Sequence, residues 1–381
     1  MTGGQQRQLD PSERLDWLSL VRTETVGPVT AYRLLERFGS ARKALEALPE
    51  MAARGGRKKP PKTPDRRTLQ REVKALEKLG GRFIAAIEPD YPPLLRHAED
   101  APPVIAIIGQ AALMNRPTVA IIGARNASLN GKRFAKSLAA DLGAAGYLIV
   151  SGFARGIDQA AHHGAIGTGT AGVLAGGVDV IYPPEQRELY DAMRGAGALI
   201  GEMPLGTKPQ GRHFPKRNRL IAGMAQAVIV VEAAQRSGSL ITAGMAADYG
   251  RDVLAVPGSP LDPRAHGTNR LIQEGAPLIQ SADDVINARE RSWKCMSERQ
   301  PDLFTARPPT QSAPAGELDD ARQRIVDCLG PAPTPVDDVI RDCQVTAASA
   351  QVVLLELEVA GRLTRLPGNK VALVTDIEQP A

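Results

Sequence analysis

The fold is decided by residues 118–158, which read TVAIIGARNASLNGKRFAKSLAADLGAAGYLIVSGFARGID. An apolar run opens this stretch, and a glycine turn, a segment of helical periodicity, a second apolar run and a second glycine turn follow in order. The pattern predicts a strand, a helix and another strand of an open parallel sheet. Turns of this kind place backbone N–H groups at the carboxyl edge of the sheet, where anions bind. Each of the two turns also carries an arginine, Arg125 and Arg155.

Further apolar runs, alternating with segments of helical periodicity, lie on both sides of this stretch. Near-continuous apolar runs that alternate with helical segments indicate a parallel sheet covered on both faces. We therefore predict a doubly wound, mostly parallel, Rossmann-like α/β domain over residues 66–290. Its other expected strands lie at residues 82–87, 170–174, 198–202, 226–232 and 252–256.

Two smaller segments flank the predicted α/β domain. Residues 1–52 contain short helical patterns and predict a helical module of the SAM or helix-hairpin-helix kind. The stretch VGPVTA at 26–31 is reminiscent of a helix-hairpin-helix phosphate binder, but the second glycine is missing, which favours a packing or partner module. Residues 318–376 show three helices and a hairpin, the winged-helix pattern.

Two connecting segments are expected between these parts. Residues 53–65 are rich in Gly, Pro, Lys and Arg and predict a basic linker. Residues 291–317 are rich in Pro, Ser, Thr and Gln and predict a disordered tether. In the winged helix, the would-be recognition helix at 347–360 contains no Lys or Arg, so a protein-contact or vestigial role is favoured over duplex binding.

Composition excludes several classes of protein. The 381 residues are 43% hydrophobic and 23% charged, which fits a soluble globular protein of two or three domains. Three cysteines lie far apart, which argues against a zinc site or a disulfide framework. No stretch approaches the roughly 20 apolar residues of a membrane span or forms a signal peptide, so a cytoplasmic protein is expected.

Charge and aromatic content bear on nucleic-acid binding. The formal charge is +5, but residues 54–74 hold nine basic and two acidic side chains, a local +7, which leaves the rest of the chain near −2. This uneven balance is weak support for nucleic acid. Aromatic residues make up only 4%, so contacts with backbone and phosphate should dominate any such binding.

Glycine turns at the ends of the predicted strands should gather along one edge of the sheet, together with helix N-termini that each contribute roughly 0.3–1 kcal/mol to anion binding. A basic element at 212–219, RHFPKRNR, directly precedes a helical run and should face the same edge. Its aromatic ring can stack on a base and its cations can pair with phosphates. Our candidate residues for an anion-binding groove are Arg125, Ser151, Gly152, Arg155, Phe214, Lys216, Arg217, Asn218, Ser237, Gly238 and Ser239.

Support for catalysis is thinner. The first turn reads GARNAS and lacks the GxGxxG dinucleotide fingerprint, and the sequence contains no Walker loop. We therefore expect no cofactor and no metal. An acid/base set is conceivable from Asp158, Glu202 and Glu232, with His162 and His163 one turn beyond Asp158. Asp158 is equally interpreted as a helix cap or an arginine partner, and adjacent histidines on a helix point in different directions.

Five sequence blocks in order resemble the DNA-processing protein A (DprA/Smf) family, and the resemblance covers about residues 91–286. They are SGFARGID at 151–158, GGVDVIYP at 176–183, FPKRNRLIAG at 214–223, VEAAQRSGSLITA at 231–243 and GTNRLI at 267–272. The flanking helical module and winged helix fit the family's common three-domain layout.

The resemblance implies a protein that binds single-stranded DNA without sequence preference, protects incoming strands during natural transformation and loads RecA recombinase onto them as a homodimer through the α/β domain. It assigns binding roles to Arg125, to the turn at Ser151 and Gly152, and to Phe214, Arg217 and Asn218. One departure is Pro184, which stands where some family members carry a lysine, so one phosphate contact is lost.

Two rival functions stay open at this point. One is an enzyme that cleaves nucleotides or transfers phosphoribosyl groups, with Asp158 or Glu232 as the base. The other is a regulator that binds duplex DNA through the winged helix. We favour the non-catalytic single-strand binder.

Overall fold

The computed structural model describes residues 6–297, 315–366 and 368–374 of the chain. Contacts between these residues divide them into two compact units. The first unit contains residues 6–10 and 70–297, and the second contains 11–69 together with 315–374. The five domain boundaries predicted from the sequence stay predictions.

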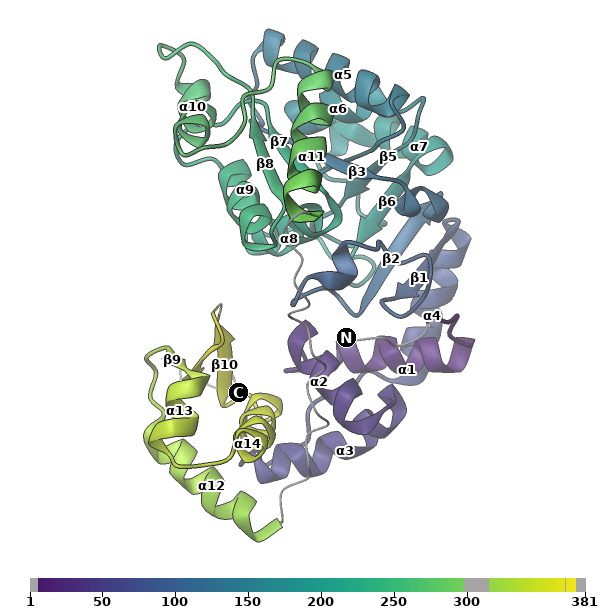
Figure 1. The fold of residues 1–381 in the computed structure, drawn as a ribbon. Helices are drawn as coiled ribbons and strands as arrows, with labels where there is room; N and C mark the ends of the chain where they lie inside the picture. Colours follow the sequence, from purple (N-terminus) through teal and green to yellow (C-terminus); the bar gives the residue numbers. More distant parts are fainter. Residues whose placement is uncertain (1–5, 298–314, 367, 375–381) are drawn as a thin grey trace. The chain divides into compact units, whose positions relative to one another are not determined.

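The first unit is built on an eight-stranded sheet with the order β1-β2-β6-β5-β4-β3-β7-β8 (Figure 1). Strand β2 runs antiparallel to both neighbours, and the pairs from β6 to β8 are parallel. The predicted mostly parallel α/β fold is therefore confirmed. The strands are β1 Gly81–Ala85, β2 Val104–Gly109, β3 Thr118–Ile122, β4 Leu148–Ser151, β5 Thr170–Val173, β6 Ala198–Gly201, β7 Ala227–Val230 and β8 Asp252–Ala255.

Helices cover both faces of the sheet, as its apolar strands require. One core cluster joins α5, α6 and α11 to strands β3, β4, β7 and β8. Helices α8 and α9 pack on each other and cover the opposite face (Figure 1). The helices of this part are α4 Arg66–Lys78, α5 Leu129–Ala144, α6 Ile157–Ala165, α7 Arg187–Ala196, α8 His213–Met224, α9 Gly238–Asp248, α10 His266–Gln273 and α11 Ala282–Ser297.

Strand β3 lies at the centre of the sheet, between β4 and β7. The chain continues from β3 to β4 and β5 on one side and later from β7 to β8 on the other. In open α/β sheets, the carboxyl ends of strands at such a switch point border a crevice. The turn after β3 and the start of α9 after β7 therefore face one opening, which is where the glycine turns were expected to gather.

The second unit combines both ends of the chain. Its N-terminal helices are α1 Pro11–Arg22, α2 Pro28–Phe38 and α3 Ala41–Arg54. Its C-terminal part has the predicted winged-helix pattern, and the side chain of Thr346 caps the third helix by accepting a hydrogen bond from the Ser349 amide at 3.1 Å. The elements are α12 Ala315–Cys328, β9 Thr334–Pro335, α13 Val336–Asp342, α14 Ala347–Val359, β10 Leu363–Leu366 and β11 Lys370–Leu373.

The two predicted linkers differ in what the structure shows. Residues 57–65 form neither helix nor strand, and Arg57 donates a hydrogen bond of 2.7 Å to Glu24 in the same unit. Two helices overlap the ends of the predicted tether 291–317, because α11 extends to Ser297 and α12 begins at Ala315. Residues 298–314 lie outside the described residues. Across the described ranges, no helix combines the length and the apolar character that crossing a membrane requires.

Candidate nucleic-acid interface

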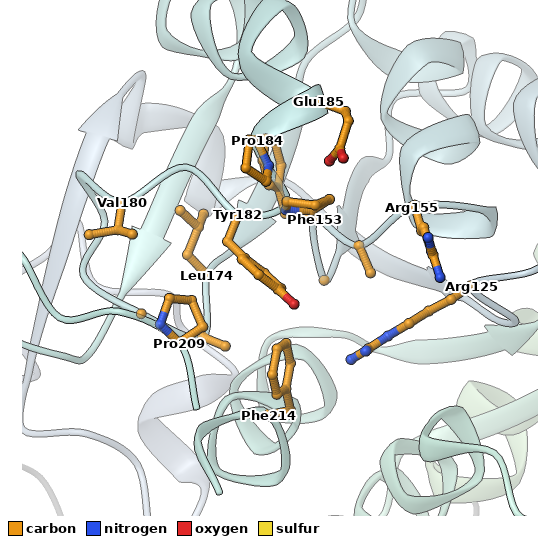
Figure 2. A pocket seen from close by; sticks show the side chains of 15 residues that line it. Arg125, Phe153, Arg155, Leu174, Val180, Tyr182, Pro184, Glu185, Pro209 and Phe214 are labelled. Atoms are coloured by element: carbon orange, nitrogen blue, oxygen red, sulfur yellow. The ribbon is translucent and has the colours of Figure 1, made fainter. Parts of the chain in front are cut away.

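Arg125 lies in the turn after β3, and its side chain is exposed. Its guanidinium lies over the ring of Phe214, 4.7 Å from the ring centroid. Phe214 is the second residue of α8, and its ring also contacts that of Tyr182 with a centroid separation of 6.1 Å. Figure 2 shows Arg125, Phe214 and Tyr182 around one opening. An arginine and two aromatic rings therefore meet at the switch point.

A first hollow of about 340 Å³ opens beside this group (Figure 2). Its walls are apolar and aromatic, except for the exposed guanidinium groups of Arg125 and Arg155 and the carboxylate of Glu185. A flat ring can lie against such apolar walls while a phosphate pairs with the two arginines. Other lining residues include Gly152, Phe153, Leu174, Tyr182, Pro184 and Pro209.

A second hollow of about 530 Å³ shares Arg125, Ala154 and Phe214 with the first. The Arg125–Phe214 stack therefore forms a wall common to both hollows. The second hollow is more polar and is lined by the start of α9. Its further lining residues include Asn126, Asp158, Arg217, Asn218, Ser237, Gly238, Ser239 and Thr242.

The first turn of α9 is arranged to receive an anion. Ser237 is its N-cap and accepts a hydrogen bond from the Ser239 amide at 3.3 Å. The two hydroxyl groups, of Ser237 and Ser239, are hydrogen-bonded at 2.7 Å. Unpaired N–H groups at a helix N-terminus carry partial positive charge. The edge of the second hollow therefore offers backbone donors in addition to side-chain cations.

Arg217 is buried and supports the loops around both hollows. Its guanidinium donates to the Gly152 carbonyl and, at 2.6 Å, to the Val173 carbonyl. Burial lowers the pKa of Arg217 to about 10, while the charge of Asp158 opposes that shift. A Cβ atom at Gly152 would lie 2.5 Å from the Arg217 guanidinium, so this turn needs glycine. Direct contact of Arg217 with DNA stays a prediction, and its geometry shows a positioning role.

Asp158 is buried near Arg217. Burial raises the pKa of the Asp158 carboxyl, and the Arg217 charge acts in the opposite direction. The carboxylate also accepts a hydrogen bond of 3.3 Å from the Ala154 amide. The sequence left helix cap and arginine partner open for this residue, and the structure shows a bond from the preceding turn, with the Arg217 charge close by but no ion pair between the two side chains.

The remaining candidates are divided between the hollows and their surroundings. Asn218 lines the second hollow and donates to the Gly238 carbonyl at 3.4 Å. Lys216 is exposed beside Phe214 but lines neither hollow. Ser151 is fully buried, and its hydroxyl donates to the Ile121 carbonyl at 2.6 Å. A DNA contact by Ser151 stays a prediction that this geometry does not support, because the hydroxyl is used inside the sheet.

Three of the candidate acid/base residues have structural partners. Glu202 forms an ion pair of 2.5 Å with Arg219, a cation of the 212–219 element. Glu232 accepts a hydrogen bond of 2.9 Å from the Ser128 amide, at the start of α5. His162 is fully buried, and burial lowers its pKa to about 3. Its Nδ1 lies 2.8 Å from the Thr170 hydroxyl, so it is a neutral core histidine.

Metal binding has no support in the described ranges, since no three His, Cys, Asp or Glu side chains there are placed to hold an ion. Tyr182 was not among the candidates predicted from the sequence, although it lines the first hollow, contacts Phe214 and is 47% exposed. The signal was available. Only six tyrosines occur in the chain, and this one precedes two prolines after a glycine turn.

Sequence models of one protein family match three parts of the chain. The sequence model described as DNA recombination-mediator protein A matches residues 82–290, which is more than half of the chain. The chain belongs to this family. The family's N-terminal HHH domain matches residues 11–75, and its winged helix domain matches 308–369. The flanking parts therefore agree with the family layout that the resemblance predicted.

Individual members of the DNA recombination-mediator protein A family give the same result. Protein Smf of Synechocystis is 31% identical, with 94% of this chain and 98% of that protein covered. DNA processing protein A of Streptococcus pneumoniae has a similar structure, with a TM-score of 0.61, 30% identity and coverage of 74% of this chain and 98% of that one.

A second solved relative is DNA processing protein A of Helicobacter pylori, a protein with a structurally characterised single-stranded DNA binding mode. It matches with a TM-score of 0.51 and 27% identity, and the match covers 56% of this chain and 96% of that one.

Proposed function

We propose that this protein binds single-stranded DNA, without sequence preference, along the two hollows that meet at Arg125 and Phe214. The observation that carries the proposal is the stack of an exposed guanidinium on an aromatic ring at the sheet's switch point. Arginine and aromatic side chains together bind single strands because phosphates need positive charge and every base offers a flat face. The Helicobacter relative, with its single-stranded DNA binding mode, supports the same assignment.

A path for the strand follows from the arrangement of the groups. A base lies against Phe214 and Tyr182 in the first hollow, and its phosphate is held by Arg125 and Arg155. The next phosphate reaches the N–H groups at the start of α9, around Gly238. Lys216 supports the strand from outside the hollows. None of these contacts reads the hydrogen-bonding edge of a base, which accounts for binding without sequence preference.

Sequence independence is tested with labelled single strands of one length and several unrelated base compositions, by fluorescence anisotropy. We expect dissociation constants that agree within a few-fold, because stacking and phosphate contacts are common to all of them. A preference of tenfold or more for one sequence would require direct base recognition and would contradict the proposal.

The wider role extends this binding activity. The protein protects single strands and loads RecA recombinase onto them during natural transformation, as a cytoplasmic homodimer through the α/β domain. Support comes from membership of the DNA recombination-mediator family and from the DNA-processing relatives. The test is RecA filament formation on single strands coated with a single-strand-binding protein, with the mass of this protein measured in parallel. Unchanged filament formation would contradict the loading of RecA, and a monomeric mass would contradict the homodimer.

A nucleotide-processing enzyme is the second candidate, because Asp158 lines the second hollow and has a raised pKa. The bond that Asp158 accepts from the Ala154 amide and the use of Glu232 at the start of α5 favour binding without catalysis. Incubation of the pure protein with nucleoside monophosphates and with single-stranded DNA separates the two. Turnover that disappears in Glu232→Gln or Asp158→Asn, while the variant stays folded, would establish the enzyme instead.

A further inference from the structure

Helix α14 of the winged helix has two buried faces. Ala350, Val353, Leu354 and Leu357 pack in the core of the winged helix itself. Leu355, Glu356 and Val359 are also buried but lie outside that core. Helices α2 and α3 of the N-terminal module pack on α14 (Figure 1). The second face is therefore covered by the opposite end of the chain.

Polar contacts between α14 and the N-terminal module are specific. Thr30 in α2 donates to the Glu358 carboxylate at 2.9 Å, and Thr25 donates to the Val359 carbonyl at 2.7 Å. Arg365 of β10 holds the second oxygen of Glu358 at 3.1 Å. Because these bonds have defined donors and acceptors, they fix the position of α14 on the module.

Gly55 allows the two parts to approach closely. It follows the last residue of α3, and a Cβ atom there would lie 2.3 Å from the Glu356 carbonyl and 2.7 Å from the Ala360 side chain. Arg362, just beyond α14, donates to the Gly55 carbonyl at 3.3 Å. Any side chain at position 55 would therefore push α3 away from the end of α14.

Charge argues against duplex DNA on this face. Helix α14 carries two glutamates and no Lys or Arg. Glu356 is fully buried and pairs with Arg322 at 2.6 Å, and Arg54 of α3 lies 3.9 Å away. Recognition helices in winged-helix and related proteins enter the major groove and approach phosphates. Arg322 and Arg365 of the winged helix already pair with the two glutamates, so removing the module would leave α14 without a free positive charge to attract those phosphates.

We propose that the second face of α14 is a docking surface for the chain's own N-terminal helical module, and that the winged helix closes the chain on itself instead of binding duplex DNA. Both ends of the chain then form one body that folds and moves together. The proposal is independent of single-strand binding, because it concerns residues of the second unit only.

The test places a recognition site for a specific protease within residues 298–314 of the full chain and cuts it. We expect the C-terminal fragment to stay with the rest of the protein in size-exclusion chromatography. Gly55→Leu should release it, because the side chain separates α3 from α14. The matched control is Gly330→Leu in the winged helix, where an added Cβ meets no atom within 4 Å, and this variant should retain the fragment.

A second variant keeps the test decisive if Gly55→Leu does not fold. Thr30→Val keeps the volume and removes one hydrogen bond to the Glu358 carboxylate, whose side chain is 11% exposed, so the fragments should associate about tenfold more weakly. Three outcomes would overturn the proposal: separation of the wild-type fragments, unchanged association in both variants, or release of the fragment by added duplex DNA. The last outcome would show that α14 prefers a duplex to the module.

Discussion

The guanidinium of Arg125 lies over the ring of Phe214, 4.7 Å from its centroid, although the two residues are far apart in the sequence. Arg125 follows the central strand β3, and Phe214 lies in the first turn of α8. A cation over an aromatic face contributes about 0.5–1 kcal/mol at an exposed site. The stack also holds the ring between the two hollows.

Phe214→Ala removes the stacking surface. Affinity for single strands should fall by about 1–3 kcal/mol, roughly 5- to 150-fold, the usual value for loss of one base–aromatic stack. The measurement is a titration of short oligonucleotides with one abasic site moved along the strand. The wild type should lose affinity when the abasic site occupies the stacked position, whereas Phe214→Ala should be insensitive. Equal sensitivity in both proteins would show that Phe214 does not stack on a base.

Arg217→Met tests whether Arg217 positions the loops or binds DNA itself. The substitution removes the donors to the buried Gly152 and Val173 carbonyls and the positive charge near the Asp158 carboxyl, so the free energy of unfolding should fall by about 1–3 kcal/mol. Adding Asp158→Asn should recover part of the loss, because the buried charge is then removed. Urea unfolding of the wild type, both single variants and the double variant measures this coupling. Unchanged stability with lost DNA binding would instead make Arg217 a direct phosphate contact.

The pH dependence of stability should reveal His162. Burial, with smaller contributions from the charges of His163 and Arg217, lowers its pKa to about 3 in the folded state. Between about pH 3 and 6.5 the His162 imidazole is therefore protonated in the unfolded chain but neutral in the folded one. The free energy of unfolding falls as the pH falls through this window. The slope from one such group is at most about 1.4 kcal/mol per pH unit.

His162→Gln should flatten this slope in urea unfolding measured from pH 4 to 7. The neighbouring His163 is exposed and contributes less than burial to the lowered pKa of His162, so His163→Gln is the control and should keep most of the wild-type slope. If His162→Gln also keeps the wild-type slope, another group causes the acid sensitivity.

Pro184→Lys restores the lysine found at this position in some family members. Pro184 lines the first hollow, so the new ammonium group should reach a phosphate there. Single-strand affinity should rise, and log K should fall more steeply with log salt by about 0.7. Pro184→Gln removes the proline without adding charge and should leave the salt slope unchanged. A lysine variant with the wild-type slope would mean that no phosphate passes Pro184.

The sequence predicted the strands of the fold better than the contacts within the candidate site. Continuous apolar runs and glycine turns were sufficient for the strands, and β3 begins and ends at the predicted residues, Thr118 and Ile122. Arg125 and Phe214 were placed at the correct edge because parallel strands share a direction. Their stacking depends on the position of α8 across the sheet, which periodicity does not determine.

The sequence did not predict which polar side chains of the candidate site are buried. Arg217 and Ser151 belong to sequence motifs that also hold exposed cations and hydroxyl groups. Only the tertiary packing shows that the Arg217 guanidinium and the Ser151 hydroxyl donate to backbone carbonyls inside the fold. The association of α14 with α2 and α3 was likewise hidden, because its residues come from opposite ends of the chain. The absence of basic residues on α14 favoured a protein-contact or vestigial role over duplex binding, and that role stays a prediction.

The central claim is tested most directly by titrating one single strand and its duplex at two salt concentrations, with wild type, Arg125→Ala and Arg270→Ala. Arg270 is a surface arginine on α10, paired with Glu274 at 2.7 Å, so its variant loses equal charge outside both hollows. The wild type and Arg270→Ala should prefer the single strand, with log K falling by about 2 to 3.5 per log unit of salt for three to five phosphates. Arg125→Ala should bind more weakly, with a slope flatter by about 0.7. Wild-type affinity and slope in Arg125→Ala would contradict the account.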